Sequence, residues 1–132
     1  MKYTFFIRIG AIALFSFGCE KTELNLDTLH GSWVESSSQT DTLVFDSSQF
    51  EGWLYLNRGK ELRNGNMLPK IGSGSYSYEI SKDSIVVQYH LSSCMCPKSY
   101  TFEILSGEDK LKIGNFYDDE IPLGEMLTFE RL

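Results

Sequence analysis

The chain has 132 residues, with 12 basic against 18 acidic side chains and a formal net charge of −6 at pH 7. This length suits one small domain, and a composition that is 42% hydrophobic argues against a disordered or low-complexity chain, because it supplies enough apolar surface for a core. The acidic balance argues against nucleic-acid binding by charge neutralisation, since an acidic surface repels a phosphate backbone.

Residues 1–18 have the features of an export signal. Lys2 and Arg8 provide the positively charged start, residues 9–17 form an apolar run, and Gly18 is a small residue directly before Cys19. A membrane-spanning helix needs about 20 apolar residues, and this run has about half that length. We therefore expect residues 1–18 to be a signal peptide rather than a transmembrane anchor.

The segment Leu14–Cys19 resembles the lipobox of bacterial lipoprotein signal peptides, with Ser16 where that family usually has Leu. In the family, the cysteine is acylated and becomes the mature N-terminus. The resemblance implies lipidation of Cys19 and a lipid bilayer as partner, because two or more acyl chains hold a protein stably on a membrane. It implies a location in the cell envelope, on the outer rather than the inner membrane, facing the periplasm or the exterior. The alternative is a secreted protein in which Cys19 has no role.

The exported part of the chain is more acidic than the whole. Residues 1–18 contain two basic side chains and no acidic ones, so their removal leaves 10 basic and 18 acidic side chains and a charge of −8. Residues 19–28 have the polar character of a tether, with one helical turn expected around Asp27–Leu29. The folded domain is expected over residues 29–132.

The rest of the chain has the two-residue periodicity of half-buried β-strands, interrupted by clusters of Gly, Asn, Asp, Ser and Pro. This pattern predicts an all-β fold. Sequential hairpins favour an eight-stranded antiparallel up-and-down barrel, because closure removes the exposed edges of an open sheet. The polar, locally basic residues 57–73 are expected to form a lid, a contact loop or a flexible connection. The eight strands are expected over residues 32–36, 42–46, 50–57, 74–81, 84–91, 98–105, 110–116 and 125–131.

Apolar residues on one face of each strand are expected to point into the barrel. Trp53 has the opposite parity from Leu54 in its strand, so it is expected on the outside unless a bulge turns it inward. The inward set comprises Leu43, Phe45, Leu54, Leu56, Tyr76, Tyr78, Ile80, Ile85, Val87, Tyr89, Leu91, Phe102, Ile104, Leu111, Ile113, Leu127 and Phe129.

Two segments resemble the lipocalin superfamily. Gly31–Trp33 is similar to its Gly-x-Trp motif at the start of the first strand, and Leu127–Arg131 resembles its closing strand. In that family, the Trp plugs the closed end of the barrel and an Arg from the last strand packs on it. The resemblance implies that Trp33 stacks with Arg131 and that the chain forms a compact lipocalin-like barrel like those of bacterial lipoproteins. The Thr-Asp-Tyr motif and the C-terminal helix of full lipocalins are missing.

The interior of such a barrel determines its function, because eight strands either enclose packed side chains or hold one small ligand. The ligand-binding candidates are Tyr76, Tyr78, Tyr89 and Phe102, since aromatic rings supply an apolar wall and hydroxyls orient a ligand. The alternative is that these side chains only fill the core. A pocket of about 300 Å³ or more would favour a small ligand, whereas a filled interior would favour an interaction surface.

Cys94 and Cys96 flank Met95 in the expected connection between the fifth and sixth strands. In an oxidising compartment, and with Cys19 acylated, these two cysteines are expected to form a disulfide. Such a close bridge is open to a labile or redox-responsive role. Alternatively, the thiols stay free, or they hold a soft ion such as Cu(I) together with Met95 and His90.

The sequence gives little support to catalysis. It contains two histidines, and neither a nucleophile elbow nor a Gly-rich phosphate loop after a strand. The carboxylates of Asp118–Glu120 lack the alternating ligands and central Gly of a calcium loop, so a solvated acidic loop is expected there. We therefore expect no enzymatic activity, no metal and no cofactor, and a monomeric protein.

These observations lead to two functional hypotheses. The first is a membrane-anchored, lipocalin-like lipoprotein that binds a small hydrophobic or amphipathic molecule. The alternative is an envelope interaction protein or enzyme inhibitor that binds a macromolecule through its loops. Residues Gly72–Tyr76 resemble a Ser-Gly-rich segment of the lysozyme-inhibitor lipoproteins, which are also small anchored barrels.

Overall fold

The computed structural model describes residues 26–46, 52–105, 107, 109–122 and 124–132. The expected signal peptide, the lipidation site Cys19 and the tether up to residue 25 lie outside these residues, as do residues 47–51. The described part contains no helix with the length and apolar character needed to span a bilayer. Its elements are η1 (Leu26–Thr28), a 3-10 helix, and the strands β1 (Gly31–Glu35), β2 (Thr42–Asp46), β3 (Trp53–Asn57), β4 (Lys60–Arg63), β5 (Asn66–Pro69), β6 (Gly74–Ser81), β7 (Ser84–Tyr89), β8 (Lys98–Leu105), β9 (Lys110–Gly114) and β10 (Met126–Arg131).

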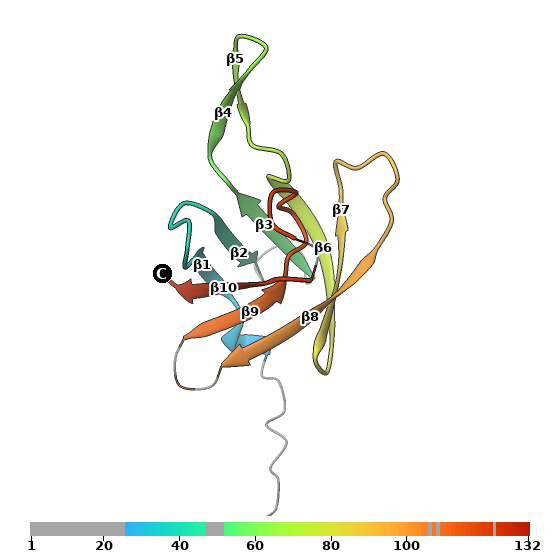
Figure 1. Cartoon of the computed structure of the whole chain (residues 1–132). Helices are drawn as coiled ribbons and strands as arrows, with labels where there is room; N and C mark the ends of the chain where they lie inside the picture. Colours follow the sequence, from blue (N-terminus) through green and yellow to red (C-terminus); the bar gives the residue numbers. More distant parts are fainter. Residues whose placement is uncertain (1–25, 47–51, 106, 108, 123) are drawn as a thin grey trace, which may run out of the picture.

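Eight of the strands form one closed antiparallel barrel in the order β1-β10-β9-β8-β7-β6-β3-β2, which confirms the predicted architecture (Figure 1). Each barrel strand pairs with the next barrel strand along the chain, as in an up-and-down meander. The ring closes where β1 pairs with β10, with Trp33 opposite Arg131 and Glu35 opposite Phe129. Closure gives each of these strands a partner on both sides, so the barrel has no open edge.

The interior of the barrel is filled by apolar side chains from alternate positions of the strands. In β3, for example, Leu54 and Leu56 are buried while Trp53 and Tyr55 are exposed, so Trp53 lies on the outside. Side chains with almost no exposed surface are Leu29, Trp33, Leu43, Phe45, Leu54, Leu56, Ile85, Phe102, Leu111, Ile113 and Phe129.

One inward prediction is wrong. Leu91 was expected to point into the barrel, but 72% of it is exposed. The reason is that β7 ends at Tyr89, two residues earlier than predicted, and the alternation between inward and outward side chains ends with the strand. The predicted strand over residues 110–116 likewise ends early, at Gly114.

The residues before β1 block one end of the barrel. The indole Nε1 of Trp33 donates a hydrogen bond of 3.0 Å to the carbonyl of Leu29, and both side chains are buried. The guanidinium of Arg131 lies over the Trp33 ring, with its Cζ 4.3 Å from the ring centroid. It also donates hydrogen bonds to the carbonyls of His30 and Thr28. This is the arrangement that the lipocalin resemblance implies, and it ties η1 to the last strand.

Strands β4 and β5 form a two-stranded hairpin that projects from the barrel (Figure 1). These two strands are an unexpected feature, because residues 57–73 were expected to form a lid, a contact loop or a flexible connection. The turn consists of Asn64 and Gly65, with φ of 53° and 80°. Two consecutive left-handed residues of this kind suit the tight hairpin turns that match the twist of β-strands.

The closed end gives a stability prediction. Replacing Arg131 by Met should lower the free energy of unfolding by about 1–3 kcal/mol, because it removes the cation-π contact and charge-assisted hydrogen bonds to two carbonyls. The control is Lys110→Met in the neighbouring strand, which removes only a solvent-exposed ion pair with Glu130 at 3.5 Å and should cost less than about 1 kcal/mol. Urea unfolding followed by tryptophan fluorescence measures both. Equal losses would contradict the assigned role of Arg131.

Candidate functional site

Four connections surround the end of the barrel opposite η1. We call this end the mouth. The connections comprise residues 36–41 after β1, residues 58–73 after β3, residues 90–97 after β7, and residues 115–122 with 124–125 after β9. Antiparallel order brings every second connection to the same end. In Figure 1 the hairpin, the 90–97 connection and the connection after β9 stand at the end of the barrel away from η1.

A pocket of about 270 Å³ opens in the mouth, between the connections after β3, β7 and β9. A second pocket of about 320 Å³ runs along residues 115–122 and shares Tyr100, Phe116 and Tyr117 with the first. The floor of the first pocket is formed by β6 and β7 through Tyr76 and Val87. The barrel is therefore filled at η1 and through its middle, and hollowed at the mouth.

Five aromatic side chains make a continuous wall along these pockets. Tyr76 and Tyr89 stack with their ring centroids 4.6 Å apart, and Phe116 packs edge-on against Tyr76 at 5.2 Å. Phe116 also contacts Tyr100 at 6.1 Å and Tyr117 at 4.9 Å. Such a wall offers flat apolar contact area to a bound molecule.

Two of the four tyrosine hydroxyls in the wall bond to the protein itself. The Tyr76 hydroxyl donates to the carbonyl of Gly72 at 2.6 Å, and the Tyr89 hydroxyl donates to the carbonyl of Ser73 at 2.8 Å. The Tyr100 hydroxyl has no hydrogen-bond partner within the described part of the chain, so it is available to a ligand. Burial raises the pKa of all three hydroxyls, which keeps them neutral near pH 7.

The four predicted ligand-binding residues do not all meet at this site. Tyr76 and Tyr89 line the first pocket. Tyr78 packs edge-on against Phe45, with centroids 5.3 Å apart, and Phe102 is 2% exposed in the core. Neither lines the mouth pockets, so the core-filling alternative describes these two. Tyr100, Phe116 and Tyr117 were not among the predicted site residues, and the one available signal was the pair of adjacent aromatic residues at 116 and 117 in a polar connection.

Arg58 joins three of the four connections. Its Nε lies 3.1 Å from the Asp41 carboxylate and its Nη2 lies 2.7 Å from that of Asp118, and all three side chains are largely buried. Its Nη1 donates to the carbonyl of Ile71 at 2.8 Å, and its Cζ lies 5.0 Å from the centre of the Tyr117 ring. Asp118, predicted to belong to a solvated acidic loop, is thus an ion-pair partner. Arg58 holds the mouth in one arrangement.

Two further polar side chains fix individual connections. The buried carboxylate of Glu35 accepts hydrogen bonds from the N–H groups of Ser37 and Ser38, at 3.0 and 2.6 Å. Burial by itself raises the pKa of Glu35, but these hydrogen bonds outweigh it, and the pKa lies below its ordinary value. The buried Asn115 amide donates to the carbonyls of Asp118 and Ile121, at 2.6 and 3.1 Å. Hydrogen bonds of buried side chains therefore hold the connections after β1 and β9, and the latter lines both pockets.

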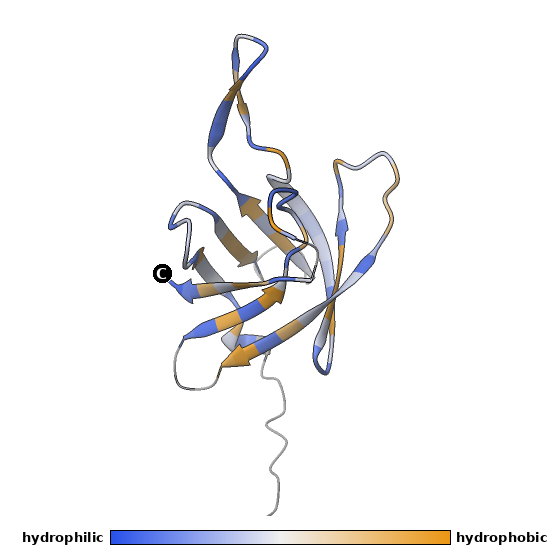
Figure 2. Cartoon of the chain, in the orientation of Figure 1, coloured by the Kyte–Doolittle hydropathy of each residue, from blue (hydrophilic) through white to orange (hydrophobic). Residues whose placement is uncertain are grey.

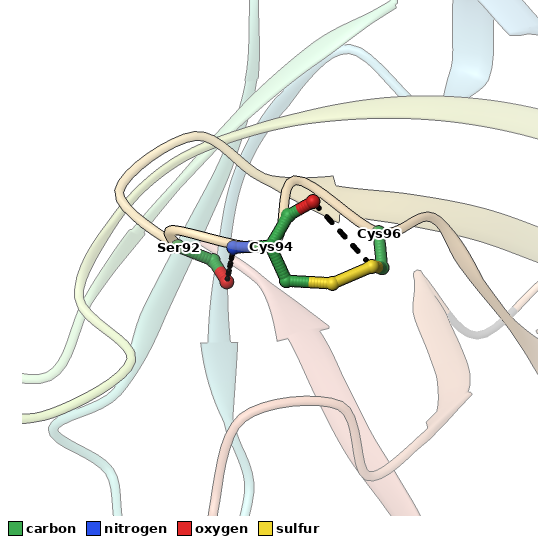
Figure 3. The surroundings of a disulfide bond; sticks show 3 residues. All are labelled: Ser92, Cys94 and Cys96. Carbon is green, nitrogen blue, oxygen red and sulfur yellow. Dashed lines mark hydrogen bonds between the residues drawn. A yellow bond between two sulfur atoms is a disulfide. The ribbon is translucent and has the colours of Figure 1, made fainter.

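Cys94 and Cys96 form a disulfide in the connection after β7 (Figure 3), with their Cα atoms 5.2 Å apart. The N–H of Cys94 donates to the Ser92 hydroxyl at 3.3 Å. Both cysteines line the 270 Å³ pocket, together with Lys98. The bridge is therefore part of the rim of the pocket.

The role of Arg58 can be tested locally. In Arg58→Met, two largely buried carboxylates lose their partner, so the connection after β9 should open more often than in the wild type. Amide hydrogen exchange at Asp118, whose N–H is bonded to Asn115 at 2.9 Å, should accelerate by about tenfold or more. Amides in β9 should keep their protection. The control Arg63→Met, which removes a partly buried ion pair with Glu61 at 3.3 Å in the hairpin, should change neither. Unchanged exchange at Asp118 would show that Arg58 does not hold the mouth.

The chain matches no protein-family model, no curated protein and no solved structure.

Proposed function

We propose that this chain is a lipocalin-like lipoprotein of the cell envelope that binds a small hydrophobic or amphipathic molecule in the mouth of its barrel. The observation that carries the proposal is the difference between the two ends. One end is blocked by Trp33 and Arg131, whereas the other opens into a pocket of about 270 Å³ with an aromatic wall. That volume is close to the lower limit of about 300 Å³ for ligand sites, and an adjoining pocket of about 320 Å³ extends it.

The lining of the pocket favours an amphipathic ligand over a purely hydrophobic one. The faces of Tyr89 and Phe116 suit a flat apolar group. Lys98 and Asp119 bring one charge of each sign to the rim, and Tyr100 brings a free hydroxyl. A ligand with an apolar body and a polar end suits both parts of the site, because polar groups that a ligand covers need new partners.

Membrane attachment belongs to the proposal and rests on the sequence. Acylation of Cys19 would hold the chain on a lipid bilayer, on the outer membrane and facing the periplasm or the exterior. Because η1 lies at the closed end, a tether entering there would leave the mouth directed away from the bilayer. In this proposal the protein acts as a monomeric binding protein and not as an enzyme.

The ligand proposal is tested by native mass spectrometry of chain purified from envelopes. The wild type should carry one small molecule per chain. Tyr100→Ala removes part of the aromatic wall and should weaken the affinity about tenfold, since a lost aromatic contact is worth about 1.4 kcal/mol, so a smaller fraction of this variant should carry the molecule. The control is Tyr55→Ala on the outer face of β3, where Tyr55 is 52% exposed, and it should retain the molecule. Equal occupancy in both variants would contradict the site.

A second candidate function, binding of a macromolecule through the loops, is favoured by one observation. In the β4–β5 hairpin, Leu62 pairs with Met67, and these side chains are 71% and 60% exposed on the same face. Figure 2 shows apolar residues along this hairpin. Lys60 and Arg63 make it locally basic on an acidic chain. An acidic partner surface with an apolar centre would suit it.

This candidate is tested by photo-crosslinking in intact cells. A photoreactive amino acid in place of Leu62 should give one discrete crosslinked product, because the hairpin would be buried against its partner. The matched control is the same amino acid in place of Lys112, on the outer face of β9, which should give none. The same products from both positions, or none from position 62, would remove this candidate.

A further inference from the structure

We propose that the Cys94–Cys96 disulfide is a thiol-exchange site, at which a thiol bound by its apolar part in the mouth pocket opens the bridge and forms a mixed disulfide. The proposal rests in part on the proposed function, because it uses the same pocket. It adds a covalent step and a ligand class, namely a thiol attached to a flat apolar group.

The bridge is poorly placed to act as a structural staple. Its cysteines are two residues apart in one connection, so it joins no two elements of the barrel. The stabilisation that a disulfide provides by restricting the unfolded chain increases with the length of the loop it closes, and is least for a loop this short. Contacts of other groups hold the mouth together, above all those of Arg58.

The position of the bridge suits attack by a bound thiol. Both cysteines are exposed, and both line the pocket with Tyr89, Tyr100 and Phe116. Thiol–disulfide exchange requires access of a thiolate to a sulfur atom, and exposed bridges are the ones that react. A molecule whose apolar group rests on the aromatic wall would hold its thiol beside the bridge, which raises the effective concentration of the nucleophile.

The backbone of the closed ring favours opening. Met95, between the two cysteines, has a φ of 48°, in the left-handed region that residues other than Gly, Asn and Asp rarely adopt. When the bridge opens, Met95 is free to leave this conformation. Opening the bridge therefore relieves backbone strain at Met95, whereas the closed form retains that strain.

The exchange step balances without an external oxidant. The thiolate of the bound molecule attacks the Sγ of one cysteine, a new S–S bond forms, and the Cys94–Cys96 bond breaks. The electron pair of that bond stays on the other cysteine, whose thiolate then takes up the proton that the incoming thiol released. Lys98, which lines the same pocket, favours negative charge there. Attack by the freed cysteine on the mixed disulfide reverses the step.

The test compares thiols that differ in their apolar part. Oxidised chain is treated with phenylmethanethiol or with 2-mercaptoethanol at equal thiolate concentration, quenched with iodoacetamide and weighed intact by mass spectrometry. Phenylmethanethiol should open the bridge and form the adduct about tenfold faster, corresponding to about 1.4 kcal/mol of recognition. A capped Phe-Cys-Phe peptide distinguishes the source of the thiol: rates like that of phenylmethanethiol indicate a peptide or protein thiol, and slow reaction indicates a small molecule.

Pocket variants separate recognition from mere exposure of the sulfurs. Ile71→Ser changes an exposed lining residue and Tyr100→Ala shortens the aromatic wall, so both should lower the phenylmethanethiol rate far more than the 2-mercaptoethanol rate and thereby abolish the preference. Met95→Asn should shift the equilibrium with glutathione about threefold toward the closed bridge, because Asn adopts a positive φ at lower cost. No shift in Met95→Asn would contradict the strain argument.

Equal rates for both thiols, or no opening by either, would overturn the proposal. These results stay distinct from failure of the proposed function. The Cys94→Ser/Cys96→Ser double variant cannot exchange, yet it should still carry a small molecule in native mass spectrometry if the pocket binds one without a covalent bond. An empty pocket in the wild type and in this variant would count against the proposed function itself.

Discussion

The pairing of β1 with β10 is the constraint on which the rest of the structure depends. It closes the sheet, and it places Arg131 over Trp33 and within reach of the carbonyl of His30, 101 positions away in the sequence. Because Arg131 and Trp33 then hold η1 across one end of the barrel, the interior is filled there by apolar side chains. Only the other end is left to open toward a ligand.

The mouth is held by polar side chains, whereas the core is held by apolar ones. Charged and amide side chains, namely Arg58, Glu35 and Asn115, use their hydrogen bonds to hold the surrounding connections. Since the partners of these groups lie within the protein, the pocket keeps a wall of five aromatic side chains beside polar groups such as Ser92, Lys98 and Asp119. This division lets a rigid frame present an apolar wall. The exposed disulfide belongs to the same rim. It adds an S–S bond to a wall that otherwise offers only non-covalent contacts.

The parts of the fold that were predictable from sequence are the strands with one buried face and one solvent-exposed face. Eight barrel strands alternate clearly, so their positions were predicted to within a few residues. The β4–β5 hairpin has exposed side chains on both faces, so its sequence lacks that alternation, and Asn64–Gly65 was the remaining signal. The site was only partly predictable. Tyr76 and Tyr89 follow from strand parity, whereas the Arg58 contacts join residues 17 and 60 positions apart, which no local pattern reveals.

Solution NMR of the isotope-labelled chain tests the central claim, barrel closure with a blocked end, most directly. The account predicts cross-strand NOEs between β1 and β10, for example between Val34 and Glu130, together with side-chain protons of Arg131 shifted upfield by the indole ring of Trp33. Absence of these NOEs, with Arg131 protons at their unfolded positions, would mean an open sheet without a plug and would contradict the account.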